Sequence, residues 1–166
     1  MQNIIIDLII NDEKWKTENI FQNYKKVIEN IVKESFVILK IVLPEDSAIE
    51  FSVVLTNNTE IQELNKQYRG KDKPTNVLSF QVIENHLNDE IAKQPYLLLG
   101  DIFVSLNVLK QEAKEQGKSI QNHFTHLCLH SFLHLLGYDH MNDIEADEME
   151  SLEVKVLEKI GIKNPY

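Results

Sequence analysis

The sequence predicts an α+β or mixed α/β fold, in which helices flank a small mixed sheet of four strands. Apolar segments typical of strands alternate with segments of helical periodicity as far as residue 106, and helical periodicity alone continues from there to residue 160. No internal repeat, low-complexity tract or linker rich in Gly or Ser divides the 166 residues. We therefore expect a single domain over residues 1–166.

The first half of the chain supplies two of the strands and two helices. In order, the predicted elements are a strand at 2–10, a helix at 17–34, a strand at 48–55 and a helix at 58–68. The first strand is apolar but has no basic start and no small-residue cleavage site, so it does not read as an export signal. The first helix follows from apolar residues at helical spacing, and the second has Asn58 or Thr59 near its cap.

The second half begins with two strands and ends with helices. In order, we predict a strand at 76–83, a polar loop at 84–95, a strand at 96–106, a short helix up to Gly117, a helix from Ser119 to Gly137 and a helix at 143–160. Ser119 is a suitable N-cap residue, and Gly117 and Gly161 are suitable ends for their helices.

The segment HSFLHLLGYDH, residues 130–140, carries the clearest chemical signal. His130 and His134 lie four residues apart, so on a helix their Cβ atoms are about 5–6 Å apart and both imidazoles can bind one metal ion. Gly137 permits a turn that ends the helix and returns His140 to the same ion. Three protein ligands leave one tetrahedral position open, as in catalytic zinc sites. The spacing therefore predicts one Zn²⁺ per chain, bound by three histidines.

The roles of other polar residues on or near this helix are less clearly indicated by the sequence. His123 and His126 share the face of the helix that carries His134, so they either extend the site or are partly exposed imidazoles. Cys128 points to another face and reads as a buried thiol. Asp139 reads as a residue that orients the turn or a ligand, and Asp101 as a supporting residue of the site or a strand-edge charge.

The choice of substrate depends on the residue after the first histidine and on the distribution of charge. Metzincin proteases carry a general-base glutamate where this chain has Ser131, which disfavours a peptidase. Hydrolysis of a phosphodiester instead needs a cation near the phosphate, and a guanidinium suits phosphate oxygens better than an ammonium. Arg69, the one arginine of the chain, lies within residues 66–73, which hold four of its 17 basic residues.

Bulk composition limits the partners. The net charge of −9 argues against nonspecific coating of nucleic acid, and no apolar run approaches the roughly 20 residues of a membrane span. Seven acidic residues against one lysine within 143–158 indicate a solvated helix face, or alternatively a surface for a basic ribosomal or GTPase partner. The single cysteine suits a cytoplasmic protein.

The segment HSFLHLLGYDH resembles the HGxLHLxGYDH signature of the YbeY family of bacterial endoribonucleases. The similarity continues through residues 64–80, 99–106 and 147–161. It implies metal-dependent cleavage of single-stranded RNA in 16S rRNA 3′-end maturation and ribosome quality control. Ribosomal RNA, the ribosome or its proteins and a ribosome-associated GTPase are the implied partners, and a small mixed sheet flanked by helices is the implied fold.

The resemblance also assigns roles to residues. The family's zinc triad falls on His130, His134 and His140, and its catalytic arginine on Arg69. Two positions depart from the family's usual pattern: Ser131 replaces a glycine, and Asn76 replaces the aspartate of TDVLSF. The alternatives to the nuclease are a zinc hydrolase of another substrate, chiefly a peptidase, and a noncatalytic ribosome-binding module in which zinc only joins the last two helices. The oligomeric state is not predicted.

Overall fold

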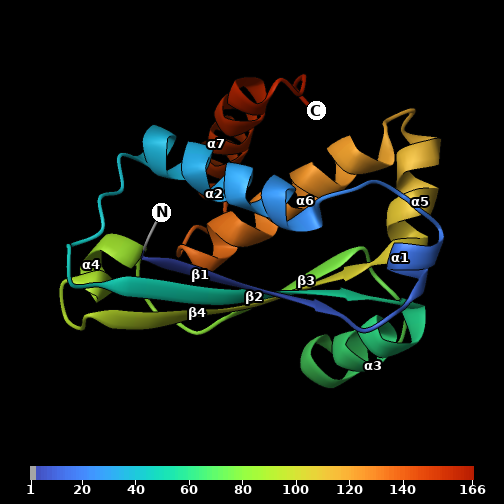
Figure 1. Cartoon of the computed structure of the whole chain (residues 1–166), viewed down its shortest axis with the longest axis horizontal. Coiled ribbons are helices and arrows are strands. Elements are labelled where there is room, and N and C mark those ends of the chain that lie inside the picture. Colours follow the sequence, from blue (N-terminus) through green and yellow to red (C-terminus); the bar gives the residue numbers. More distant parts are fainter. Residues whose placement is uncertain (1–2) are drawn as a thin grey trace.

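A computed structural model describes residues 3–166 and confirms the predicted α+β class (Figure 1). Within this range the chain forms one mixed sheet of four strands in the order β1-β2-β4-β3, together with seven helices. The strands are β1 (Ile4–Ile10), β2 (Ala48–Thr56), β3 (Val77–Gln81) and β4 (Tyr96–Ser105). Strands β1, β2 and β4 are parallel, and β3 pairs antiparallel with β4. Edge strand β3 therefore lies beside a strand that is buried within the sheet.

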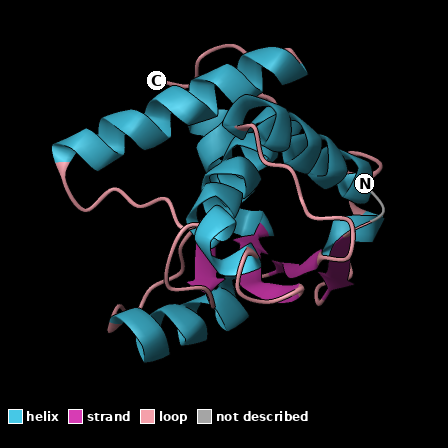
Figure 2. Ribbon diagram, turned by 90° about the vertical axis from the view of Figure 1, so that its left-hand side faces the viewer, coloured by secondary structure: helices cyan, strands magenta, loops and turns pink. Residues whose placement is uncertain are grey.

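The helices are arranged in layers over the sheet. They are α1 (Lys14–Thr17), α2 (Tyr24–Leu39), α3 (Asn58–Arg69), α4 (Leu87–Ile91), α5 (Leu106–Glu115), α6 (Ile120–Leu135) and α7 (Asp143–Ile160). Helices α2 and α6 cover one face, and α7 packs against both of them on the side away from the sheet (Figures 1 and 2). Helix α3 lies on the opposite face (Figure 1).

Helix α6 is the central helix of the core. Its side chains contact β3 and β4 as well as helices α2, α5 and α7. Ten of its 16 residues are buried, including Phe124, Phe132 and the predicted buried thiol Cys128. A helix that is enclosed in this way has little freedom to shift, so any polar side chains on its remaining face are held in a defined position.

Three details of the predicted elements are wrong. The helix expected at 17–34 instead begins at Tyr24, because Asn19 and Asn23 adopt positive φ angles of 47° and 61° that interrupt a helical path. The cap of α3 is Asn57, whose side chain accepts a hydrogen bond from the Glu60 amide.

The third error concerns the segment 84–95, for which the sequence predicts a polar loop. It contains the five-residue helix α4, and Leu87 and Ile91 of this helix belong to the core. The Leu87 amide donates a hydrogen bond of 3.1 Å to the Leu136 carbonyl at the end of α6. A helix this short has no detectable periodicity, and it forms here because tertiary contacts stabilise it.

The remaining boundaries agree closely with the prediction. Ser119 caps α6 by accepting a hydrogen bond from the Asn122 amide, and Gly161 ends α7 with a φ of 87°. Residue 2, the first of the predicted strand 2–10, lies outside the described residues. No helix in the described part of the chain combines the length and the apolar character that a membrane crossing requires.

Candidate metal centre

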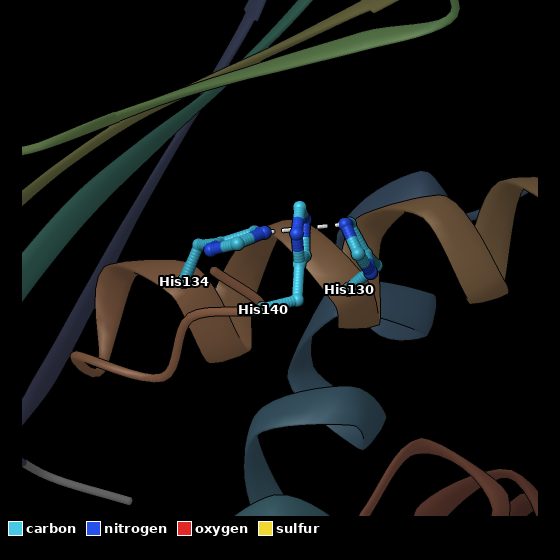
Figure 3. Close-up of side chains that lie close together, drawn as sticks. All are labelled: His130, His134 and His140. Atoms are coloured by element: carbon cyan, nitrogen blue, oxygen red, sulfur yellow. Dashed lines mark hydrogen bonds between the residues drawn. The ribbon is translucent and has the colours of Figure 1, made fainter. Parts of the chain in front are cut away.

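The three predicted histidines lie together at the C-terminal end of α6. His130 and His134 project from the same face of the helix, and His140 returns to them from the turn that follows (Figure 3). One imidazole nitrogen of each residue lies within 4.8 Å of those of the other two. Atoms this close can bind a single ion, so the cluster can hold a metal.

Gly137 makes the return of the chain possible. Its φ is +100°, which residues with a side chain rarely adopt. A Cβ at this position would also lie 2.8 Å from the Asn85 carbonyl oxygen and 2.9 Å from the His86 Cα. The segment that precedes α4 therefore packs directly against the turn that carries His140, and only glycine fits between them.

Hydrogen bonds determine which nitrogen of each helix histidine faces the cluster. His134 Nδ1 lies 3.0 Å from the Tyr138 carbonyl oxygen, and His130 Nδ1 lies 2.6 Å from Oε1 of Glu153. A carbonyl and a carboxylate only accept, so both Nδ1 atoms donate and, in neutral imidazoles, both Nε2 atoms carry a lone pair. The two Nε2 atoms approach to 3.2 Å. Two lone pairs at that distance repel each other unless a cation lies against both, so the donor set fits a metal ion.

Burial keeps His134 in the form that binds metal. Burial first, and then the neighbouring His130 and His140, lower the pKa of His134 to about 4. The imidazole of His134 is therefore neutral near pH 7, and its Nε2 is available as a ligand.

Glu153 is the exception to the expected solvated face of the acidic stretch 143–158, whose other acids are exposed or partly exposed. Its side chain is 1% exposed and lies on the buried face of α7 with Met149, Val156 and Leu157. Burial alone would raise the pKa of Glu153, but hydrogen bonds with His130 and Tyr166 and the nearby His126 imidazole outweigh burial and lower this pKa to about 2. The carboxylate is therefore ionised.

The cluster opens into a cavity of about 490 Å³ that Arg69 also lines. Arg69 is the last residue of α3, and residues of β3 line the same cavity as the arginine and the histidines. Its guanidinium has no ion pair or hydrogen bond with any side chain between residues 3 and 166, whereas the nearby Lys66 pairs with Asp72 at 2.8 Å. The cavity thus combines a cluster that can hold a metal with an available guanidinium.

Comparisons with known proteins agree with this geometry. A sequence model of the family described as Endoribonuclease YbeY matches residues 9–161. The chain is 53% identical over 117 residues to Endoribonuclease YbeY of Colwellia psychrerythraea, which covers 70% of this chain and 72% of that protein. It is 43% identical over 159 residues to Endoribonuclease YbeY of Francisella tularensis subsp. holarctica, which covers 92% of this chain and 93% of that protein. The chain belongs to the YbeY endoribonuclease family.

A solved structure supports the fold. The solution structure of TM1509 from Thermotoga maritima superposes with a TM-score of 0.55 at 24% identity, covering 95% of this chain and 91% of that one. This likeness concerns the arrangement of helices and strands alone.

The two departures from the usual YbeY pattern have different surroundings. Asn76 lines the cavity, donates to both carboxylate oxygens of Glu112 at 3.2 and 3.0 Å, and accepts from the Val77 amide at 2.7 Å. An aspartate could not donate to Glu112, so the amide suits this position. Ser131 is fully buried, and its hydroxyl has no hydrogen-bond partner in the described part of the chain. It does not line the cavity.

The other polar residues that the sequence singled out near the site have different surroundings in the structure. His126 lines the cavity, whereas His123 is buried and bonds through Nε2 to Glu112 at 2.7 Å. Asp139 accepts a hydrogen bond from the His140 amide at 2.8 Å, which agrees with a role in orienting the turn. The Asp101 side chain has no hydrogen bond or ion pair to residues 3–166 and does not line the cavity.

Three residues near the site were not predicted: Glu112, Glu153 and Tyr166. Glu153 did carry a signal, because Met149, Glu153, Val156 and Leu157 follow helical spacing and place one acid within an apolar stripe. Tyr166 reaches the cavity, and Glu112 reaches Asn76 and His123 outside the metal cluster, only through tertiary packing, so neither carried a comparable signal.

Proposed function

We propose that this chain is a zinc-dependent endoribonuclease that cuts single-stranded RNA, acting in 16S rRNA 3′-end maturation and in ribosome quality control. The observation that carries the proposal is the shared cavity, which is lined by Arg69 from α3 and by the three histidines of α6 and its turn. Membership of the YbeY family supports RNA as the substrate. The proposal treats residues 1–166 as one metal-dependent endoribonuclease domain.

His130, His134 and His140 would hold one Zn²⁺. When bound, zinc supplies Lewis acidity, which lowers the pKa of water toward about 7 and polarises a phosphoryl oxygen. The Tyr138 carbonyl and the Glu153 carboxylate keep the Nδ1 atoms of the two helix ligands protonated, so that their Nε2 atoms face the cavity. The protein thus orients its ligands before the substrate arrives.

Arg69 would bind the phosphate. Charge builds up on the phosphate oxygens in the transition state, and the planar guanidinium can donate two parallel hydrogen bonds to them. Because no described side chain pairs with Arg69, it loses no protein contact when it engages RNA. The catalytic residues that we propose are therefore Arg69 and the three histidines.

The cellular setting is also part of the proposal. We assign the protein to the cytoplasm, with rRNA, the ribosome or its proteins and a ribosome-associated GTPase as partners. The exposed acids of α7, such as Glu150, support a contact with a basic protein surface, because they lie on the solvent side of that helix.

One experiment separates this function from its alternatives. The zinc-loaded protein is incubated with labelled single-stranded RNA and with casein, with and without a chelator. We expect RNA to be cut only by the metal-loaded protein and casein to remain intact. Cleavage of casein would instead support a peptidase, and zinc binding without cleavage of either substrate would support a noncatalytic module.

A further inference from the structure

A buried carboxylate stands directly behind the first metal ligand. Glu153 reaches from α7 across to α6, where Oε1 lies 2.6 Å from His130 Nδ1. Its second oxygen, Oε2, accepts a hydrogen bond from the Tyr166 hydroxyl and lies 3.6 Å from His126 Nε2. Each carboxylate oxygen therefore has its own partner, and the oxygen that faces the metal cluster contacts His130 alone.

The fold by itself does not explain this residue. Burying an ionised carboxylate costs several kcal/mol unless partners compensate, and an apolar residue of similar size would pack at least as well against α6. No lysine or arginine among residues 3–166 pairs with Glu153. Its partners are two histidines and a tyrosine that all line the cavity.

We propose that Glu153 is a positioning residue that fixes His130 with Nδ1 protonated, so that Nε2 of His130 is the nitrogen that binds the metal. Tyr166 and His126 act on the other oxygen and prevent the carboxylate from turning away. A metal-ligating histidine whose other nitrogen donates to a carboxylate is better oriented and more basic. The inference rests on the proposed zinc site and adds to it a residue from a helix outside the HxxxHxxGxxH segment.

The chain offers a matched control for this proposal. Glu112 of α5 forms a similar carboxylate–histidine contact with α6, at 2.7 Å from His123 Nε2. His123 does not belong to the metal cluster and does not line the cavity. A change from Glu to Gln at position 112 therefore alters a carboxylate–histidine pair on the same helix without touching a metal ligand.

The test compares the zinc affinity of wild type, Glu153→Gln and Glu112→Gln by competition with a chromophoric chelator. We expect Glu153→Gln to weaken zinc binding about 10- to 100-fold. A glutamine accepts less strongly from Nδ1, and its amide group can turn to donate and so favour the wrong tautomer. Glu112→Gln should bind zinc like wild type, and metal-free Glu153→Gln should melt below the wild-type temperature because the fold stabilises the ionised carboxylate that it removes.

A second measurement avoids any dependence on the folding of the variant. The ¹⁵N shifts of His130 in zinc-free wild-type protein at pH 8 should report a protonated Nδ1 and an unprotonated Nε2. The opposite tautomer would overturn the proposal, as would unchanged zinc affinity in Glu153→Gln when wild type binds zinc. A wild-type protein that binds no zinc would overturn the proposed function and this inference together.

Discussion

Of the two helix histidines proposed as ligands, His134 has surroundings that depend least on other side chains, since a backbone carbonyl accepts from its Nδ1. We expect His134→Ala to abolish stoichiometric zinc binding while most of the secondary structure remains, because the side chain removed is a proposed ligand. Zinc content by mass spectrometry and far-ultraviolet circular dichroism provide the two readouts. His86→Ala removes an exposed histidine that packs edge-on against Tyr138 but does not belong to the cluster, so it should retain zinc. Unchanged zinc in His134→Ala would contradict the ligand assignment.

Substitution of Arg69 tests whether the planar geometry of the guanidinium or only its positive charge matters for binding the phosphate. Lysine keeps the charge but loses one of two directed hydrogen bonds, each worth about 1.5–3 kcal/mol when charged. Since about 1.36 kcal/mol is a factor of ten in rate, Arg69→Lys should cut RNA roughly 10- to 150-fold more slowly. Its zinc content and melting temperature should remain close to those of wild type, because Arg69 is exposed and unpaired among residues 3–166.

The matching variant for that measurement is Arg69→Gln, which removes the positive charge as well as the paired N–H donors of the guanidinium. If the two parallel hydrogen bonds of the guanidinium are what matters, the cleavage rate of Arg69→Lys should lie nearer to that of Arg69→Gln than to that of wild type. A lysine variant with near-wild-type activity would reduce Arg69 to a general source of positive charge.

The turn between α6 and α7 depends on one glycine. In Gly137→Ala the new Cβ meets the backbone of Asn85 and His86 at 2.8 and 2.9 Å, and the φ of +100° becomes strained. Strain and overpacking each cost about 1–3 kcal/mol, and the turn can relieve both only by moving His140. We expect a less stable protein with weakened zinc binding.

Gly117→Ala is the control for this prediction. Gly117 also has a positive φ, +63°, but no atom lies within 4 Å of the Cβ that alanine would add. Alanine there should cost about 1–2 kcal/mol and leave zinc binding unchanged. Chemical denaturation and zinc titration of both variants give the comparison, and equal zinc affinities would show that the turn accommodates a side chain at position 137.

The stability of the whole metal-free molecule should fall on acidification through two consecutive ranges. The folded pKa of His134 is lowered to about 4 from an unfolded value of 6.5, so the unfolded state binds more protons between these values and stability falls as the pH drops from 6.5 to 4. Glu153, lowered to about 2 from 4.5, continues the loss from pH 4.5 to 2. Urea unfolding with a chelator present measures both ranges.

The control for the first range is His134→Gln, which cannot titrate. Its free energy of unfolding should depend less on pH between 6.5 and 4 than that of the wild type. Equal pH dependence in the two proteins would show that His134 does not carry the effect.

Much of this molecule follows from the sequence because the relevant signals are local. The four strands, the Ser119 cap and the end of α7 at Gly161 depend on the pattern of neighbouring residues, and the structure confirms them. The proximity of the three histidines is local too, because a spacing of four on a helix and a glycine turn determine it within eleven residues.

Tertiary structure alone decided the features that depend on residues distant in the chain. Helix α4 forms because Leu87 and Ile91 enter the core, which no five-residue pattern can reveal. Arg69 lines the histidine cavity only because α3, β3 and α6 meet at that place. Glu153 lies 23 residues from His130, and the packing of α7 on α6 turns an acid in a charged stretch into a buried partner of a proposed metal ligand. Local sequence determines side-chain spacing, but burial and long-range contact depend on how the elements pack.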